Sequence, residues 1–252
     1  MINKLIPIIA PVSVFIAWEA IIASPKLFSS GLIAVAMILF ILLLKLNNFK
    51  IKSKDFWLLS IPPFFFALFL TMFVLFLNST FLQHFLVLVG AVSLYFYLRH
   101  FYNFLFQIAR YKPLSLEGFS SYFSIISFLL FVISSYGLIN FLNIKLYYLA
   151  LAVIVASFIL SYQFFWINKI DEQHNLFASI LMSILAVEFF WSMSFFPISH
   201  FVVGFALAIT YYVFTNLTLM HFLGKLDKRL VKIYISLGVF CVLIILLSAK
   251  WL

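Results

Sequence analysis

Nine long apolar segments, separated by short polar breaks, run through the sequence. Each is close to the roughly 20 apolar residues that an α-helix needs to cross the hydrocarbon core of a bilayer. The predicted spans are Leu5–Ala23, Ser30–Leu46, Phe56–Leu77, Phe81–Leu98, Phe119–Leu142, Leu146–Trp166, Leu176–Phe196, Phe201–Leu223 and Ile233–Leu252. The shortest breaks carry Asn, Ser or Pro, which favours tight turns between consecutive spans. The pattern predicts an all-α, polytopic transmembrane helix bundle that forms a single integral membrane domain over residues 1–252.

The amino-acid composition agrees with this pattern and excludes two other classes of protein. Hydrophobic residues make up 66% of the chain and charged residues 9%, whereas a soluble domain carries roughly 45–50% apolar and 25% charged residues. Intrinsic disorder requires low hydrophobicity and high charge. A soluble globular fold and a disordered chain are therefore both excluded. The single cysteine, Cys241, leaves no partner for an intramolecular disulfide.

The basic residues alternate between the two sides of the predicted bundle. If the N-terminus is cytoplasmic, thirteen of the sixteen Lys and Arg residues fall on the cytoplasmic side and three on the other side. The cytoplasmic ones are Lys4, Lys45, Lys50, Lys52, Lys54, Arg99, Arg110, Lys112, Lys169, Lys225, Lys228, Arg229 and Lys232. Cytoplasmic loops are enriched in Lys and Arg, so the asymmetry predicts an N-in, C-out orientation. We expect these basic loops to meet anionic lipid or a protein partner, and we expect no nucleic-acid partner.

The longest loop, 99–118, has an amphipathic pattern in its first half. Phe101, Phe104 and Leu105 share one helical face with Ile108, and polar residues occupy the opposite face. Two interpretations fit this pattern equally well. One is a short interfacial helix at 99–112 on the cytoplasmic surface, and the other is an extension of the fourth span out of the membrane.

Two acidic residues, Glu19 and Glu188, lie inside predicted spans. Carboxylates in the bilayer core are energetically expensive, so they usually face the interior of the bundle and often mark function. Both are expected in the outer half of the bilayer, where they are candidates for one shared cavity. Trp18 and Trp191 are candidate N–H donors to them, and His200 lies just beyond the outer end of the Glu188 helix. These five residues form the candidate intramembrane polar site, which is either a proton, cation or substrate site or a hydrogen-bonded contact between helices.

The other polar side chains of the spans favour helix packing over chemistry, because such groups usually hydrogen-bond neighbouring helices. They include Tyr136, Asn140, Tyr162, Gln163, Thr210, Tyr211, Tyr212, Thr215, Asn216, Thr218 and His221. The sequence contains no phosphate-binding loop, no G-x-S-x-G and no H-E-x-x-H. The five His residues have no metal-ligand spacing. We therefore expect no cofactor, no metal and no catalytic residue.

The C-terminal third carries a pattern that is similar to a known group of sequences. The residues that carry it are Glu188, Trp191, Pro197, Tyr211, Tyr212, His221, Gly224–Leu226, Arg229, Tyr234 and Ala249–Trp251. The Phe-rich third span, His84 and Leu94–Leu98 are similar too. The pattern resembles an uncharacterised family of bacterial multi-span inner-membrane proteins of unknown function. The resemblance implies a multi-pass protein of the bacterial inner membrane and no catalytic residue.

Three hypotheses about function follow from these features. The leading one is an uncharacterised integral membrane protein with a non-catalytic structural or assembly role. The alternative is a secondary transporter or channel for a proton, ion or small solute that uses Glu19 and Glu188. The third is a membrane enzyme that acts on a lipid with one of these glutamates as acid or base. A water-accessible cavity that holds both carboxyl groups would favour the second or the third hypothesis.

Overall fold

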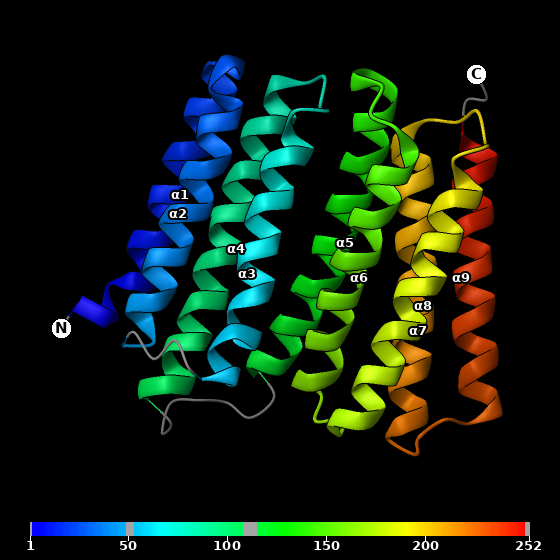
Figure 1. Cartoon of the computed structure of the whole chain (residues 1–252). Coiled ribbons are helices and arrows are strands. Elements are labelled where there is room, and N and C mark those ends of the chain that lie inside the picture. Colours follow the sequence, from blue (N-terminus) through cyan, green and yellow to red (C-terminus); the bar gives the residue numbers. More distant parts are fainter. Residues whose placement is uncertain (1, 49–52, 108–114, 250–252) are drawn as a thin grey trace. The chain divides into compact units, whose positions relative to one another are not determined.

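The computed structural model describes residues 2–48, 53–107 and 115–249. Within these ranges, nine helices are long and apolar enough to cross a membrane (Figure 1). They are α1 (Ile6–Ala23), α2 (Phe28–Leu46), α3 (Lys54–Val74), α4 (Thr80–Phe106), α5 (Ser115–Leu142), α6 (Leu146–Ile167), α7 (Glu172–Met193), α8 (His200–Phe222) and α9 (Lys228–Ser248). Two short 3-10 helices, η1 (Ile2–Lys4) and η2 (Pro25–Leu27), flank α1. For these ranges the predicted all-α class is confirmed, with nine helices that are long and apolar enough to span a membrane. The N-in, C-out orientation stays a prediction.

Several helices begin earlier than the hydropathy pattern predicts, and in α3 and α7 a polar side chain caps the N-terminus. The hydroxyl of Ser53 accepts a hydrogen bond from the Phe56 N–H at the start of α3. The carboxylate of Asp171 accepts one from the His174 N–H at the start of α7. Such caps satisfy backbone N–H groups that the first helical turn leaves without a partner. The apolar stretch alone therefore places the start of α3 two residues late and that of α7 four residues late.

The end of the fourth helix tests the two interpretations of segment 99–112, an interfacial helix or an extension of the fourth span. The test covers the part of this segment that the structure describes. α4 runs without a break to Phe106, so residues 99–106 extend the fourth span. A separate interfacial helix is wrong for this stretch, because the helix continues through it without a break. Phe101 is buried in the first unit, so the last turns of α4 pack against the other helices of that unit. The remainder of the predicted interfacial element, 108–112, lies outside the described residues.

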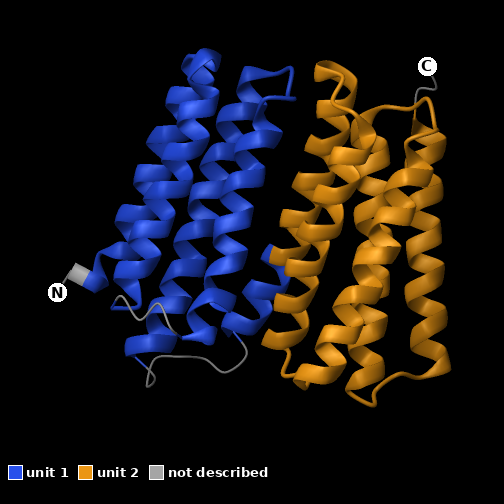
Figure 2. Ribbon diagram, in the orientation of Figure 1, with its two compact units in different colours: residues 1–123 blue, residues 124–252 orange. Residues whose placement is uncertain are grey.

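The helices form two compact units, residues 1–123 and 124–252 (Figure 2). The first unit holds α1 to α4 and the beginning of α5, and the second holds the rest of α5 and α6 to α9. The division falls inside α5, between Phe123 and Ser124. The single integral membrane domain over residues 1–252 stays a prediction.

The first unit packs α1 against α2 and α4, and α3 against α2 and α4. Its interior shows how a helix that contains proline keeps its backbone hydrogen-bonded. Pro63 in α3 has no N–H to donate to the carbonyl of Leu59, four residues earlier. The buried hydroxyl of Tyr97 on α4 donates to that carbonyl at 2.8 Å. This bond ties α3 to α4 at the point where proline interrupts the helical ladder.

The second unit packs α6 against α7, α7 against α8, and α8 against α9. Glycines allow two of its helices to approach others closely. A Cβ atom added to Gly204 of α8 would lie 3.0 Å from the Cα atom of Ile133 in α5. One added to Gly238 of α9 would lie 2.8 Å from a methyl group of Val213 in α8. Small residues at helix interfaces let transmembrane helices approach, so these two positions set the spacing of α8 from α5 and from α9.

Candidate functional site

Glu19 is paired with a histidine near the beginning of the fourth helix. The Nδ1 atom of His84, on α4, lies 2.8 Å from one carboxylate oxygen of Glu19 and 3.1 Å from the other. Glu19 is four residues from the end of α1 and His84 is four residues from the beginning of α4, so the packing of these helices brings both to one end of the unit. The side chains are 32% and 52% exposed, respectively. A carboxylate and an imidazole at this distance can hold a proton between them.

Trp18 is adjacent to Glu19 in the sequence but points to a different neighbour. Its indole N–H donates a hydrogen bond to the hydroxyl oxygen of Thr71 on α3 at 2.7 Å, and Trp18 is fully buried. The hydroxyl of Thr71 in turn donates to the carbonyl of Ala67. The expectation that Trp18 donates to Glu19 is therefore wrong. Residues 18 and 19 differ by about 100° around a helix, so one faces the core of the unit and the other its surface.

Glu188 and Trp191 lie on α7 in the second unit, and both side chains are exposed. Within the described residues, the Glu188 carboxylate has no hydrogen-bond or ion-pair partner, and its backbone carbonyl accepts from the Ser192 hydroxyl. Because α7 runs from Glu172 to Met193, Glu188 lies about 8 Å from the midpoint of its helix. The apolar stretch alone places it about 3 Å from the centre of the span. The Asp171 cap, which starts the helix earlier, accounts for much of this correction.

His200 begins α8, and its ring lies 5.5 Å from the ring of Phe141 in an edge-on arrangement. The five candidate residues are therefore divided between the two units, with Trp18 and Glu19 in the first and the others in the second. A cavity shared by Glu19 and Glu188 stays a prediction. Within the described part of the chain, no group of three or more His, Cys, Asp or Glu side chains is placed to hold a metal ion.

Several polar side chains inside the second unit bond helices to one another, as the sequence predicts. The Ser124 hydroxyl donates to the Gln163 side chain at 2.6 Å, which joins α5 to α6. The hydroxyl groups of Ser161 and Tyr211 are 2.7 Å apart, which joins α6 to α8. The Tyr136 hydroxyl donates to a backbone carbonyl of α7 at 2.6 Å. These side chains are buried. Each hydrogen bond offsets the free-energy cost of burying a polar group and at the same time joins two helices.

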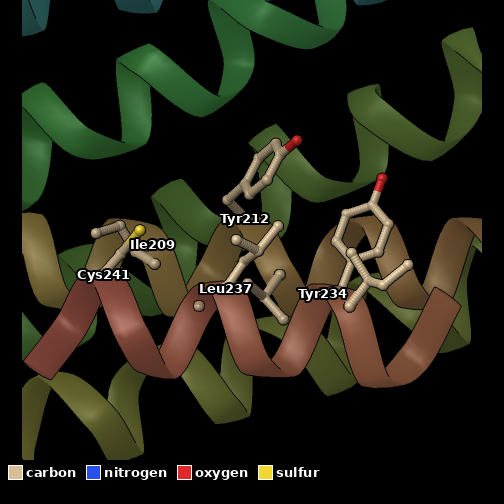
Figure 3. A pocket seen from close by; sticks show the side chains of 8 residues that line it. Ile209, Tyr212, Tyr234, Leu237 and Cys241 are labelled. Carbon is tan, nitrogen blue, oxygen red and sulfur yellow. The ribbon is translucent and has the colours of Figure 1, made fainter. Parts of the chain in front are cut away.

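Two apolar grooves flank the line along which α9 meets α8. The first has a volume of about 500 Å³ and is lined by Ile209, Tyr212, Val213, Ile233, Tyr234, Leu237, Gly238 and Cys241. Figure 3 shows Ile209 and Tyr212 on α8 facing Tyr234, Leu237 and Cys241 on α9, with the two tyrosine rings at the same rim of the groove. Their ring centres are 6.5 Å apart. We call this the tyrosine groove.

The second groove lies on the other flank of α9 and has a volume of about 360 Å³. It is bounded by Phe189 and Met193 of α7, Phe214 and Leu217 of α8, and a strip of α9 that runs from Ile235 to Leu243. We call this the α7–α9 groove. Gly238 and Val213 line both grooves, so the close contact between these two residues separates them.

Comparison of the sequence with protein families places the chain in a known group. A family model described as "Protein of unknown function (DUF5656)" matches residues 20–248. The chain belongs to this family. The DUF5656 match begins one residue after Glu19 and includes His84 and Glu188. No curated protein matches the chain, and no solved structure does. Membership of DUF5656 confirms the resemblance to an uncharacterised family and assigns no activity to any residue.

Sequence reasoning missed His84 and Thr71 as partners of the candidate residues in this DUF5656 protein. The signal for His84 was its predicted position at the outer end of the fourth span, at the same side of the membrane as Glu19. That signal places a residue at a depth but does not say which helices are neighbours. For Thr71 the pattern offers no comparable signal, because it is one hydroxyl within a long apolar helix.

Proposed function

We propose that this protein is a non-catalytic structural or assembly component of a membrane, and that this membrane is the bacterial inner membrane. The observation that carries the proposal is the use of the buried polar side chains. The contacts Trp18–Thr71 and Ser161–Tyr211 each join two helices within one unit. A path for a polar solute needs such groups to face a water-filled space, whereas a scaffold needs them to hold its helices together.

The surface that we propose for assembly is the outer face of α9. No residue of α9 is buried, and its main packing partner is α8. Phe240, Ile244 and Leu247 follow one another at helical spacing on the side away from Gly238, and all three are exposed. A transmembrane helix that is apolar on all sides and held along one edge offers the remaining sides to lipid or to another protein.

Site-specific photocrosslinking in the native membrane tests this proposal. A photoreactive residue at position 240 should give one crosslinked product of defined mass. Position 33 on α2 provides the matched control, because Ile33 is 64% exposed and Phe240 is 60% exposed. The proposal is refuted if both positions give the same set of products, or if position 240 reacts with lipid alone.

A second candidate function is supported by the Glu19–His84 pair. We infer that a proton or cation transporter would use this pair, because a carboxylate and an imidazole 2.8 Å apart, on helices able to span a membrane, can together bind a proton. Purified protein in proteoliposomes with an internal pH-sensitive dye tests this function. Glu19→Gln and His84→Asn should each slow proton entry at least tenfold, whereas Asp227→Asn should not. Glu188→Gln distinguishes a mechanism with one carboxylate from one with two. Equal rates in wild type, variants and empty vesicles would exclude this candidate.

A further inference from the structure

We propose that the α7–α9 groove holds an acyl chain of an anionic phospholipid, and that Lys228 and Lys232 of α9 bind its phosphate. The assembly role is not needed for this proposal, because the groove and the outer face of α9 are different surfaces. The ligand class follows from two features that coincide on one side of α9. One is a narrow apolar groove, and the other is a pair of positive charges at its end.

The dimensions of the groove suit a single hydrocarbon chain. Its strip on α9 extends from Ile235 to Leu243, which is about 12 Å along the helix axis. The walls carry Phe189, Phe214 and Leu217, which match the apolar character of an acyl chain.

The two lysines share the groove's face of α9. Lys228, Lys232, Ile235, Val239 and Val242 follow one another at intervals of four, three, four and three residues, which places them along one stripe of a helix. The last three line the groove. Lys232 precedes Ile235 by about 4.5 Å along the axis and Lys228 by about 10 Å. Both ammonium groups belong to exposed side chains, and neither has an ion-pair partner within the described residues.

Charge decides which of the two grooves binds an anionic lipid. In a bilayer an apolar groove does not by itself select a lipid, because lipid tails are as apolar as the protein surface. Selection then comes from the headgroup, and basic residues at the membrane surface attract anionic lipids. In the helical register, Leu230 is the residue below the tyrosine groove, and Arg229 lies on the side of α9 that faces neither groove. The α7–α9 groove is therefore the one with cations at its end.

Native mass spectrometry of the delipidated full-length protein tests this proposal. The protein is titrated in neutral detergent with dioleoyl phosphatidylglycerol, which is anionic, and with dioleoyl phosphatidylcholine, which is zwitterionic. We expect tighter binding of the first phosphatidylglycerol molecule by about fivefold for each lysine. The double variant Lys228→Gln/Lys232→Gln should bind both lipids equally. Arg229→Gln, which removes the same charge from the same turn, should keep the preference within about twofold.

A second pair of variants tests the groove itself. Val239→Trp fills the α7–α9 groove and should abolish the tight phosphatidylglycerol site, whereas Leu237→Trp, which fills the tyrosine groove, should retain it. The charge variants leave helix packing untouched, so the test does not depend on the folding of the tryptophan variants.

Three results would overturn the proposal. The first is a preference that survives the double lysine variant, and the second is one lost equally in Arg229→Gln. The third is a wild-type protein that shows no lipid preference but forms a dimer, which Val239→Trp dissociates. That result would assign the groove to a second copy of the chain. The crosslink from position 240 tests the assembly role and is expected to be unchanged in the double lysine variant, so the two proposals fail separately.

Discussion

Replacing Gly204 with alanine tests the closest approach between helices in the second unit. The added Cβ atom would lie 2.3 Å from a side-chain carbon of Ile133, 3.0 Å from its Cα atom and 3.1 Å from its backbone nitrogen. Carbon atoms are in favourable contact at about 3.5–4.0 Å, so α8 and α5 must separate by roughly 0.5–1 Å. The side chain of Ile133 can rotate away, but its backbone cannot move without the whole helix.

The size of the effect follows from two opposing contributions. Overpacking of this kind costs about 1–3 kcal/mol, and alanine in a helix gains about 1 kcal/mol over glycine. We therefore expect Gly204→Ala to lower the free energy of unfolding by up to about 2 kcal/mol, which corresponds to a fall of up to roughly 8 °C in the midpoint of thermal unfolding. The measurement is thermal unfolding in one detergent, followed by tryptophan fluorescence.

Two other glycines provide graded controls. A Cβ atom on Gly118 of α5 would meet nothing within 4 Å, so Gly118→Ala should leave stability unchanged or raise it by up to about 1 kcal/mol. Gly90→Ala on α4 would meet a methyl group of Leu70 at 2.3 Å and no backbone atom, so its effect should fall between the two. If Gly204→Ala is as stable as Gly118→Ala, the backbones of α5 and α8 are farther apart at Gly204 and Ile133 than in the structure.

Three further substitutions test other contacts. Thr71→Val removes the acceptor of the Trp18 indole and should lower the free energy of unfolding by about 1–3 kcal/mol, because a buried N–H then lacks a partner. Tyr211→Phe removes one hydrogen bond between α6 and α8 but keeps its aromatic ring, so the loss should be about 0.5–1.5 kcal/mol. For Asp171, the hydrogen bond from His174 holds the carboxyl pKa below its ordinary value. Its stabilising contribution is complete above the ordinary pKa of a carboxyl group and is lost as pH falls through the lower pKa of the folded state. Wild type should therefore lose more thermal stability than Asp171→Asn between about pH 6 and about pH 3.

Each of these substitutions has an outcome that contradicts its reasoning. Thr210→Val is the control for Thr71→Val, because the Thr210 hydroxyl bonds only within its own helix, and a change of equal size in both would refute the special role of Thr71. A Tyr211→Phe protein as stable as wild type would show that the contact with Ser161 does not hold α6 to α8. If the thermal stabilities of wild type and Asp171→Asn change in parallel with pH, the Asp171 carboxylate does not stabilise the N-terminus of α7.

The candidate site was only partly predictable, and Glu19 shows why. The position of Glu19 within an apolar segment predicts how deep it lies in the membrane, and the same is true of His84. That the two side chains meet depends on α1 and α4 being neighbours and on the rotation of each helix. In an amphipathic helix the periodicity of apolar residues identifies the buried face. The spans of this chain are apolar on nearly every side, so they lack that signal. The pattern therefore could not show that Trp18 faces inward and Glu19 outward.

By itself, the sequence predicted the nine apolar helices that the structure shows within its described residues, because the length and hydropathy needed to cross a bilayer are local properties of a chain segment. It also located the charged loops, and the asymmetry of those loops predicts the orientation. Only the tertiary structure paired Glu19 with His84, placed Tyr97 on the carbonyl that Pro63 leaves free, and opened a groove beside α9 in line with two lysines. Those features depend on which helices touch and how each is rotated, and residues far apart in the sequence decide both.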